Sequence, residues 1–431
     1  MNSVAQIKIF NKKVGAVAYD NDKGVAFFEF EGSFLKAGFD LSPIKMPIKN
    51  AKGNIFSFAE LSRSNTFKGM PGLLADVLPD KYGNTLINNW LTKNGRTTGS
   101  LNPVETLCFI GKRGMGALEF NPVNPPTANN ITKVEIGNIV QVAQDILSER
   151  KTFSGNLSAE EEKALADILK IGTSAGGARA KAIIAYNPIT KEVKSGQTDA
   201  PIGFSHWLIK FDGVEDEQLG TSNGYGKVEM AYYKMAIDCG IEMMESQLFE
   251  ENGRAHFMTR RFDRPTENTK LHVQTFCAMQ HYDFNDVGLY GYEQLFETMR
   301  ILNLPYPQHE QLYRRMLLNV MGRNCDDHTK NFAFIMNEHA EWKLAPAYDV
   351  CHAYRPASPW VSKQSLSVNG KRENISKDDV LAVAKSLSIK KAAKIITQVS
   401  EIVNHWENYG DEQKVPAKLR DAIKATLLPM E

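Results

Sequence analysis

The polar residues between positions 324 and 331 are of the types, and at the spacing, that could carry chemistry. Asp326 lies five residues before Asn331 in the segment CDDHTKNF. In a kinase catalytic loop the same interval separates the aspartate that accepts the substrate's hydroxyl proton from the asparagine that binds magnesium. The interval lets the loop arch, so that the carboxylate faces the substrate and the amide oxygen faces the metal. Taken alone, Asp326 would more often be a helix-terminal residue in a surface loop.

A further carboxylate, Asp349, follows the apolar segment KLAPAY. The pattern predicts that Asn331 opens a strand, that the chain turns over residues 337–342, and that a returning segment reaches Asp349. Such a hairpin brings the two oxygen-bearing side chains to the same end, where they suit one Mg²⁺ ion. His328 and Lys330 could bond phosphate or fix the loop, although a solvated loop side chain is the simpler interpretation for either one.

Glycines gather in residues 172–184, GTSAGGARAKAII. Because glycine permits positive φ and lets backbone N–H groups approach an anion, such a loop can cradle phosphates. Its spacing matches neither the P-loop nor the dinucleotide-binding fingerprint, so a plain turn is the alternative.

Lys210 interrupts the apolar segment HWLIKFD. A cation in a buried strand costs several kcal/mol unless it meets an anion, and a nucleotide phosphate would supply one. The alternative is that Lys210 lies on the solvent face of an alternating strand. Glu229, on the helix expected next, is either an ion-pair partner for Lys210 or a solvated helical residue.

The elements expected to position these residues begin with a β-meander over residues 4–30 and a helix containing Leu86 to Leu91. Pro and Asn are concentrated in residues 121–130, which favours a linker. Residues 133–149 are expected to be helical. A second helix is expected from the N-cap Ser158 to near Gly172.

Beyond residue 172 the pattern predicts strands over 180–187, 206–212 and 255–264, with a helix over 227–239. From about residue 275 the chain is predicted to be mostly helical, and one helix should end at Gly322. A strand-rich segment followed by a helix-rich one is the order of a two-lobed nucleotide kinase. The glycine loop, Lys210, the Asp326 to Asn331 interval and Asp349 follow in the order that a kinase requires.

Composition restricts the class of protein without identifying it. The chain has 431 residues, 42% apolar and 23% charged, and its net charge of +1 gives no global basic field for nucleic acid. Neither a signal peptide nor a membrane span is expected, so we expect a cytoplasmic protein. Five widely spaced cysteines without CxxC spacing argue against a disulfide framework and a zinc site.

Six segments together resemble those of the HipA family of bacterial toxin kinases. They occur in the family's order and span roughly two thirds of the chain. The segments are FKGMPGLLADVLPDKYGNTLI (67–87), RGMGALEF (113–120), TSAGGARAKA (173–182), RRFDR (260–264), CDDHTKNF (325–332) and LAPAYDV (344–350).

The resemblance implies an α+β protein with a small N-terminal mixed α/β subdomain and a two-lobed protein-kinase-like fold, distantly similar to lipid kinases, whose C-terminal lobe is largely helical. The corresponding boundaries are 1–125, 126–265 and 266–431. ATP and Mg²⁺ are the implied cofactors. Asp326 matches the catalytic aspartate, Asn331 and Asp349 the magnesium ligands, and Ser174 an autophosphorylated serine, although a local hydrogen bond is an equal explanation for this hydroxyl. The implied nucleotide contacts are Ala175, Gly176, Gly177, Ala178, Arg179, Lys181, Lys210, Arg260, Phe262, His328 and Lys330.

Two positions depart from the family pattern. Arg260 occupies the hinge position that often holds Glu, which affects the contacts expected with adenine. Ala180 stands where many relatives carry Pro or Glu.

The resemblance also implies partners. Family members phosphorylate a serine or threonine of a translation-related protein, typically glutamyl-tRNA synthetase. They are neutralised by a HipB helix-turn-helix antitoxin, through which operator DNA is contacted. Two alternatives stay open: a catalytically silent nucleotide-binding scaffold or co-repressor in an antitoxin–operator complex, and a phosphotransferase acting on a small alcohol.

Overall fold

The computed structural model describes residues 3–122, 136–147, 180–195, 199–214, 223–266 and 269–430. The chain divides into two compact units. Unit 1 comprises Met1–Gly226, Gln247–Val273 and Met336–Ala340, and unit 2 comprises Lys227–Ser246, Gln274–Ile335 and Glu341–Glu431. The predicted helix from Ser158 to Gly172 and most of the predicted linker lie outside the described residues. Within the described residues, no helix is both long and apolar enough to cross a membrane.

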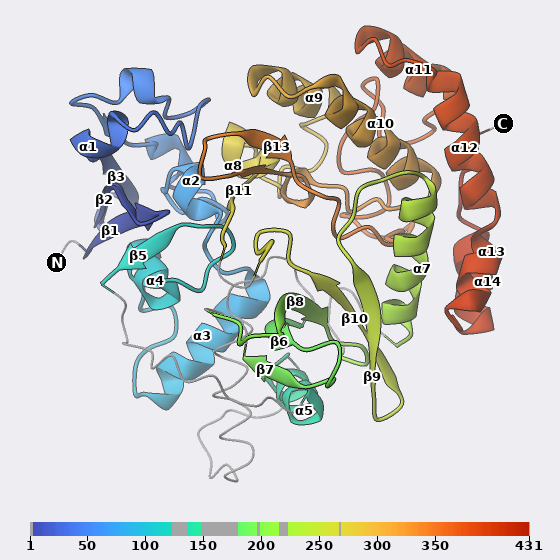
Figure 1. Cartoon of the computed structure of the whole chain (residues 1–431), viewed down its shortest axis with the longest axis horizontal. Coiled ribbons are helices and arrows are strands. Elements are labelled where there is room, and N and C mark those ends of the chain that lie inside the picture. Colours follow the sequence, from blue (N-terminus) through green and yellow to red (C-terminus); the bar gives the residue numbers. More distant parts are fainter. Residues whose placement is uncertain are drawn as a thin grey trace. The chain divides into compact units, whose positions relative to one another are not determined.

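Unit 1 begins with a five-stranded sheet in the order β4-β3-β2-β1-β5. Figure 1 labels four of its strands, β1, β2, β3 and β5. The predicted meander is confirmed, because β1, β2 and β3 pair as consecutive antiparallel strands. Alternate apolar residues such as Ile7, Val17 and Phe28 are fully buried, as expected of strands with one face on a core. The strand bounds are β1 Ser3–Ile9, β2 Lys12–Asp20, β3 Val25–Phe30, β4 Ile55–Phe56 and β5 Glu119–Asn121.

Helices lie between β3 and β5 in the sequence, and two of them begin with capping side chains. Asp80 accepts a hydrogen bond from the Gly83 N–H at 2.7 Å at the start of α3. Asn102 and Glu105 form a capping box at the start of α4. The bounds are α1 Gly32–Leu35, η1 Ile48–Asn50, η2 Ala59–Leu61, α2 Gly72–Ala75, α3 Lys81–Lys93 and α4 Pro103–Ile110.

A second five-stranded sheet in unit 1 has the order β7-β6-β8-β10-β9 (Figure 1). Its core joins Ala182, Ile184 and Trp207 of the sheet to Tyr82 and Leu86 of α3 and to four apolar residues of α5. The helix within 133–149 and the strands over 180–187 and 206–212 are thereby confirmed, whereas the strand predicted over 255–264 already ends at Arg260. The bounds are α5 Ile136–Leu147, β6 Lys181–Tyr186, β7 Val193–Ser195, β8 Ser205–Lys210, β9 Ser246–Glu251 and β10 Arg254–Arg260.

A buried ion cluster joins the RRFDR segment to the loop before β5. The fully buried carboxylate of Asp263 accepts hydrogen bonds from Arg261, from Arg264 and from the Gly116 N–H, each at 2.7 to 2.8 Å. The two guanidinium groups hold the pKa of Asp263 well below its usual range against the opposing effect of burial. The Gly116 contact spans 147 positions of sequence.

His256 makes the stability of unit 1 depend on pH. Burial lowers its pKa to about 4, and its Nδ1 accepts the Asp212 N–H at 2.8 Å. The unfolded chain therefore binds a proton below its pKa of about 6.5, whereas the folded chain does not until about pH 4. The contribution of neutral His256 to the free energy of unfolding is therefore complete above about pH 6.5, and it is lost as the pH falls towards 4.

We expect thermal melts between pH 7 and pH 4.5 to show a falling Tm, with a shallower slope for His256→Asn. The amide oxygen of Asn can still accept the Asp212 N–H but cannot be protonated in this range. This one site accounts for up to about 3 kcal/mol of the pH dependence. Equal slopes for the two proteins would contradict the assignment.

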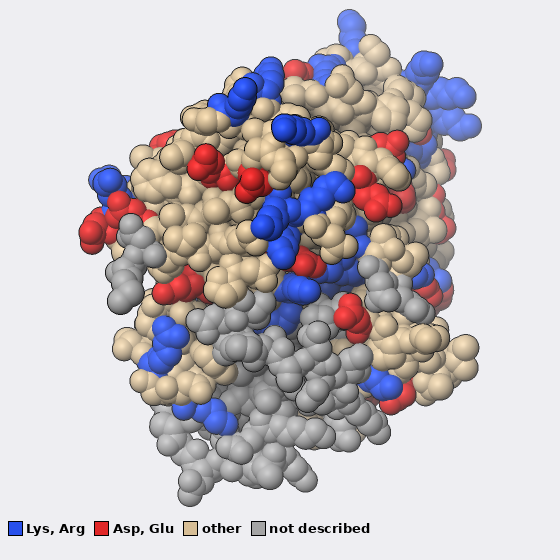
Figure 2. All heavy atoms as spheres, turned by 60° about the vertical axis from the view of Figure 1, so that its left-hand side comes forward, with Lys and Arg blue, Asp and Glu red and all other residues tan. Residues whose placement is uncertain are grey.

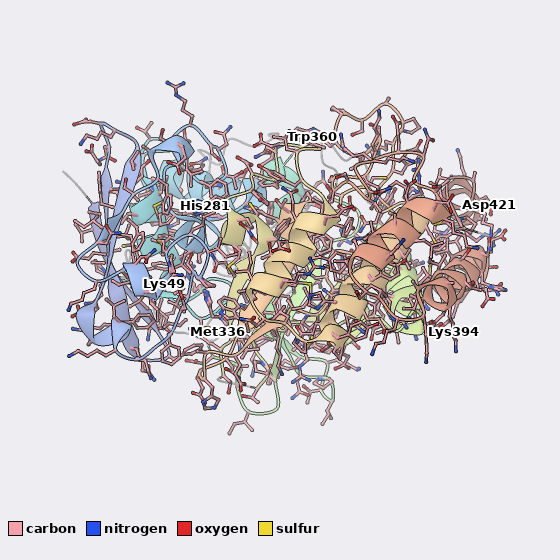
Figure 3. The ribbon with its side chains drawn as sticks, turned by 90° about the horizontal axis from the view of Figure 1, so that it is seen from above. Lys49, His281, Met336, Trp360, Lys394 and Asp421 are labelled. Atoms are coloured by element: carbon pink, nitrogen blue, oxygen red, sulfur yellow. The ribbon has the colours of Figure 1, made fainter. Side chains whose placement is uncertain are left out.

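Unit 2 is mostly helical, as predicted for the chain beyond residue 275. A third sheet has three strands in the order β11-β12-β13. Figure 3 labels Met336, the last residue of β12, and His281, which follows α8 in the left-handed region with φ 56°. The bounds are α7 Tyr225–Asp238, β11 His272–Thr275, α8 Phe276–Gln280, α9 Tyr292–Ile301, α10 Tyr306–Met321, η3 Thr329–Asn331, β12 Ala333–Met336, β13 Trp342–Leu344, α11 Lys377–Ser386, α12 Ala392–Asn404, α13 Trp406–Glu412 and α14 Ala417–Lys424.

Candidate active site

Helix α10 delivers the polar loop that contains Asp326. Its apolar residues, including Leu312, Met316 and Leu317, are fully buried, and its C-cap is Gly322, where the helix was predicted to end. The next residue, Arg323, has φ 55° and turns the chain out of the helix. The loop therefore starts from a rigid element, which is a requirement for placing a catalytic group precisely in space.

Asn331 is bonded back to the backbone of Asp326. Its Nδ2 donates to the Asp326 carbonyl oxygen at 2.6 Å. This bond closes the loop from Asp326 to Asn331 and fixes the amide, so that Oδ1 is directed away from the Asp326 carbonyl. Asp326 itself keeps an accessible side chain, 49% exposed, whose Oδ1 lies 3.9 Å from His328 Nε2. The loop thus holds the Asp326 carboxylate and the Asn331 amide oxygen apart, so that each is available to a different ligand atom.

The prediction that Asn331 opens a strand is wrong. Asn331 is the last residue of the 3-10 turn η3, and β12 begins at Ala333. The turn forms because His328 caps it, its Nδ1 accepting the Lys330 N–H at 3.3 Å. The return segment is also shorter than predicted, because β13 ends at Leu344.

The segment that carries Asp349 is tied to this loop within unit 2. The hydroxyl of Tyr348 donates to the Lys330 carbonyl at 2.6 Å, and Asn324 Nδ2 lies 3.4 Å from the Asp349 carbonyl. Asp349 adopts the left-handed backbone conformation with φ 58°, which Asp tolerates better than most residues. The two predicted magnesium ligands therefore lie on neighbouring segments, and both offer the oxygen atoms that Mg²⁺ prefers.

His328 and Lys330 pack against the same aromatic ring. The His328 ring centre lies 5.1 Å from that of Phe284, and Lys330 Nζ lies 4.9 Å from the same centre. These contacts favour the interpretation in which both residues fix the loop. A contact between either residue and phosphate stays a prediction.

Two of the predicted nucleotide-binding lysines lie opposite each other in unit 1. Lys181 of β6 and Lys210 of β8 are direct partners in the antiparallel register, an arrangement that is unfavourable for like charges unless one is compensated. The charge of Lys181 is compensated by Asp80. Lys181 Nζ lies 2.8 Å from Asp80 Oδ2, and the side chains of Lys181 and Asp80 are 3% and 10% exposed. Lys210 is half-buried, with Nζ 5.9 Å from the Phe257 ring centre.

The buried Asp80–Lys181 pair predicts a large effect on stability. Replacing Lys181 by Met leaves the Asp80 carboxylate buried without its cation, which should lower the free energy of unfolding by about 3 to 5 kcal/mol. Thermal or urea unfolding measures the loss. The matched variant Lys191→Met, at an exposed turn lysine, should change stability by less than about 0.5 kcal/mol. If Lys181→Met lowers the free energy of unfolding by less than about 1 kcal/mol, the pair contributes no more than an ordinary surface ion pair, and the prediction is wrong.

The remaining predicted nucleotide contacts fall in two groups. Arg260 ends β10, and its Nη2 lies 3.4 Å from the Pro265 carbonyl, while Phe262 is half-buried in the turn that follows. Ser174 and the five residues Ala175, Gly176, Gly177, Ala178 and Arg179 lie outside the described residues. Glu229 of α7 is 5% exposed, so the alternative of a solvated side chain is wrong for it.

Sequence reasoning missed two acidic residues of these regions. Asp80 was not singled out, yet an Asp directly before a helical apolar pattern is an N-cap signal. Asp327 is fully buried, and its position beside Asp326 gave no sign of this. A buried lysine in a strand needs an anion, and that argument could have led from Lys181 to a search for its partner.

Comparisons with known proteins agree on one family. Residues 5–121 match the sequence model of the HipA N-terminal domain, and residues 173–406 match that of the HipA-like C-terminal domain. No curated protein sequence matches the chain.

A solved structure from Shewanella oneidensis MR-1, described as the toxin–antitoxin system HipA, HipB and its operator DNA complex, contains a similar chain. The TM-score is 0.64 at 15% identity, over 98% of this chain and 96% of that one. The Helicobacter pylori proinflammatory kinase CtkA matches at TM-score 0.33 and 14% identity, over 58% of this chain and 92% of that one. The first similarity confirms the predicted fold class.

Proposed function

The chain belongs to the HipA family, and we propose that it is an ATP- and Mg²⁺-dependent serine/threonine protein kinase of the toxin type. The observation that carries the proposal is the closed loop in unit 2. The bond from Asn331 Nδ2 to the Asp326 carbonyl separates an exposed carboxylate from an amide oxygen, and Tyr348 ties the Asp349 segment to the same loop.

Each residue of this loop has a role in the proposed reaction. Asp326 orients the attacking hydroxyl of the protein substrate and accepts its proton. Asn331 Oδ1 and the Asp349 carboxylate would hold Mg²⁺, which when bound offsets charge on the β- and γ-phosphates. We assign Lys210 of β8, which lies directly opposite the Asp80-paired Lys181, to the α- or β-phosphate.

The proposed partners follow the family. The substrate is a translation-related protein such as an aminoacyl-tRNA synthetase, Ser174 is a site of autophosphorylation, and a HipB-like antitoxin neutralises the kinase. We propose that operator DNA is contacted mainly through the antitoxin. The net charge of +1 and the acidic side chains lying among basic ones on the face drawn in Figure 2 support this.

The experiment that tests the proposal follows the label from γ-labelled ATP. The chain is incubated with labelled ATP, Mg²⁺ and a cell extract, with and without a chelator. We expect label on serine or threonine of one main protein and on Ser174, and none after chelation.

Other outcomes assign the chain to a different class. Label confined to small metabolites would indicate a small-alcohol phosphotransferase. A higher Tm in the presence of ATP without any transfer of label would indicate a nucleotide-binding scaffold, since a ligand at 100 times its Kd adds about 2.7 kcal/mol. Either outcome would overturn the proposal.

A further inference from the structure

Asp327, the neighbour of the exposed Asp326, is 0% exposed. Its carboxylate accepts hydrogen bonds from uncharged groups of unit 2. Oδ2 accepts the hydroxyl of Tyr292 at 2.7 Å and Gln364 Nε2 at 3.1 Å, and Oδ1 accepts the Ser365 N–H at 2.7 Å. Two adjacent carboxylates therefore point in opposite directions, one into the protein and one towards solvent.

The residues that hold Asp327 also hold the chain on the other side of Asp326. Gln364 Nε2 donates to the Asn324 carbonyl at 3.1 Å, and the Ser365 hydroxyl donates to the Cys325 carbonyl at 2.9 Å. Gln364 and Ser365 thus bind the backbone before Asp326 and the side chain after it. The backbone of Asp326 is clamped from both sides.

The network continues into two helices. Tyr292 belongs to α9, and its hydroxyl accepts Asn319 Nδ2 of α10 at 3.0 Å; Asn319 Oδ1 in turn accepts Asn324 Nδ2 at 3.0 Å. Hydrogen bonds to α9 and α10, as well as bonds within the loop, therefore hold Asp326 in position. A displacement of the loop would break several of these bonds together.

The network is costly as a stabilising device. The donors to Asp327 are a hydroxyl, an amide and the backbone N–H groups of Ser365 and Leu366, none of which carries a charge. Burial raises the pKa of Asp327 to about 7 in spite of these bonds. Ionised carboxylates buried without a cation usually weaken a fold, so a role in function accounts for the residue better than a role in stability.

We propose that Asp327 is a positioning residue that holds Asp326 in place for proton acceptance, acting through its bonds to Tyr292, Gln364 and Ser365. This inference rests on the proposed kinase function. Asp327 does not reach the substrate, because its side chain is enclosed by the protein. Its contribution is to the placement of the neighbouring carboxylate.

The test is Asp327→Asn, assayed by transfer of phosphate from ATP to protein. The amide has nearly the same shape, but one acceptor becomes an NH₂ group that faces the donors Tyr292 and Gln364. We expect kcat to fall by roughly 10- to 100-fold, as misplacement of a catalytic group by about 1 Å does. The KM for ATP should not change, because the nucleotide-binding residues are untouched.

The dependence of kcat on pH is a second measurement, and a purely structural role of Asp327 would not alter it. Wild-type kcat should fall as the pH is lowered through about 7, and Asp327→Asn should lack this limb. Tyr292→Phe removes one donor to the carboxylate, so the limb should move to higher pH. The titratable groups that face Asp327 do not confuse the profile, because burial raises the pKa of Tyr292 far above 10 and that of Cys325 to about 12.

Asp379→Asn is the matched control. Asp379 is also a buried aspartate of unit 2 and accepts bonds from Asn369, Lys371 and Ser376 at 2.8 to 2.9 Å, but it caps α11 away from the loop. We expect this variant to lose stability and keep the wild-type kcat. Equal kcat values for wild type and Asp327→Asn would overturn the inference. If Asp327→Asn does not fold, an unmoved limb in Tyr292→Phe would do the same.

Hydrogen exchange separates failure of this inference from failure of the proposed function. If the wild type transfers no phosphate, the kinase proposal fails, and exchange of the peptide covering residues 323–331 still reports on the clamp. Faster exchange in Asp327→Asn, but not in Asp379→Asn, would support positioning of the loop. Unchanged exchange would overturn it.

Discussion

Replacing Asp326 by Asn is expected to lower kcat for phosphoryl transfer by roughly 10²- to 10⁴-fold, the range that a positioned general base contributes. Asn is nearly isosteric with Asp but cannot accept the substrate's proton. The bond that closes the loop is made to the backbone carbonyl of residue 326, so the substitution preserves it. The measurement is initial-rate transfer of γ-phosphate to the labelled protein.

The same substitution should leave the fold and ATP binding intact. The Asp326 side chain is 49% exposed, and exposed substitutions usually change stability by less than about 0.5 kcal/mol. Asp421→Asn, at the exposed α14 residue labelled in Figure 3, is a control for loss of one surface carboxylate. Equal transfer by the wild type and Asp326→Asn would remove Asp326 from the mechanism.

Sequence reasoning succeeded where the signal is local. The apolar spacing of α10 and its end at Gly322 could be predicted because helix period and glycine C-caps lie within one segment. The interval from Asp326 to Asn331 is local in the same way, and the structure joins these two residues by a hydrogen bond. The antiparallel meander of β1 to β3 follows from alternation and turn residues.

The missed contacts are those made between distant segments. Asp80 and Lys181 are separated by 101 positions, and Tyr292 and Asp327 by 35. Neither pairing has a local signature, because two side chains meet only after helices and strands have packed. Residue type also does not determine which way the side chains of two consecutive aspartates point. Burial of Asp327 and exposure of Asp326 result from the residues that surround the loop.

The start of β12 shows a different limit. The apolar run after Asn331 predicted a strand from that residue, whereas the chain first makes the turn η3. The capping bond from the Lys330 N–H to His328 Nδ1 competes with extension of the strand. A side-chain bond to the local backbone therefore moved the boundary by two residues, to Ala333, and placed Asn331 in the loop with Asp326.

Asp349→Asn should lower kcat by roughly 10²- to 10³-fold at fixed Mg²⁺ and raise the Mg²⁺ concentration needed for half-maximal rate. The loss follows from a charged ligand becoming neutral, since metal ions supply several kcal/mol of transition-state stabilisation. Asn is the suitable replacement because residue 349 has φ 58°, a conformation that Asn also tolerates. A titration of rate against Mg²⁺ measures both effects.

Two comparisons show whether the effect arises from the metal. Mn²⁺ binds nitrogen and oxygen ligands but accepts a looser geometry than Mg²⁺, so it should restore part of the rate of Asp349→Asn. Asp349→Ala removes the ligand and also strains the backbone at positive φ, so its Tm should fall by more than that of the Asn variant. Because only the Ala variant adds backbone strain, a rate loss shared by both variants is assigned to the altered metal ligand. An unchanged Mg²⁺ dependence in Asp349→Asn would exclude this carboxylate as a metal ligand.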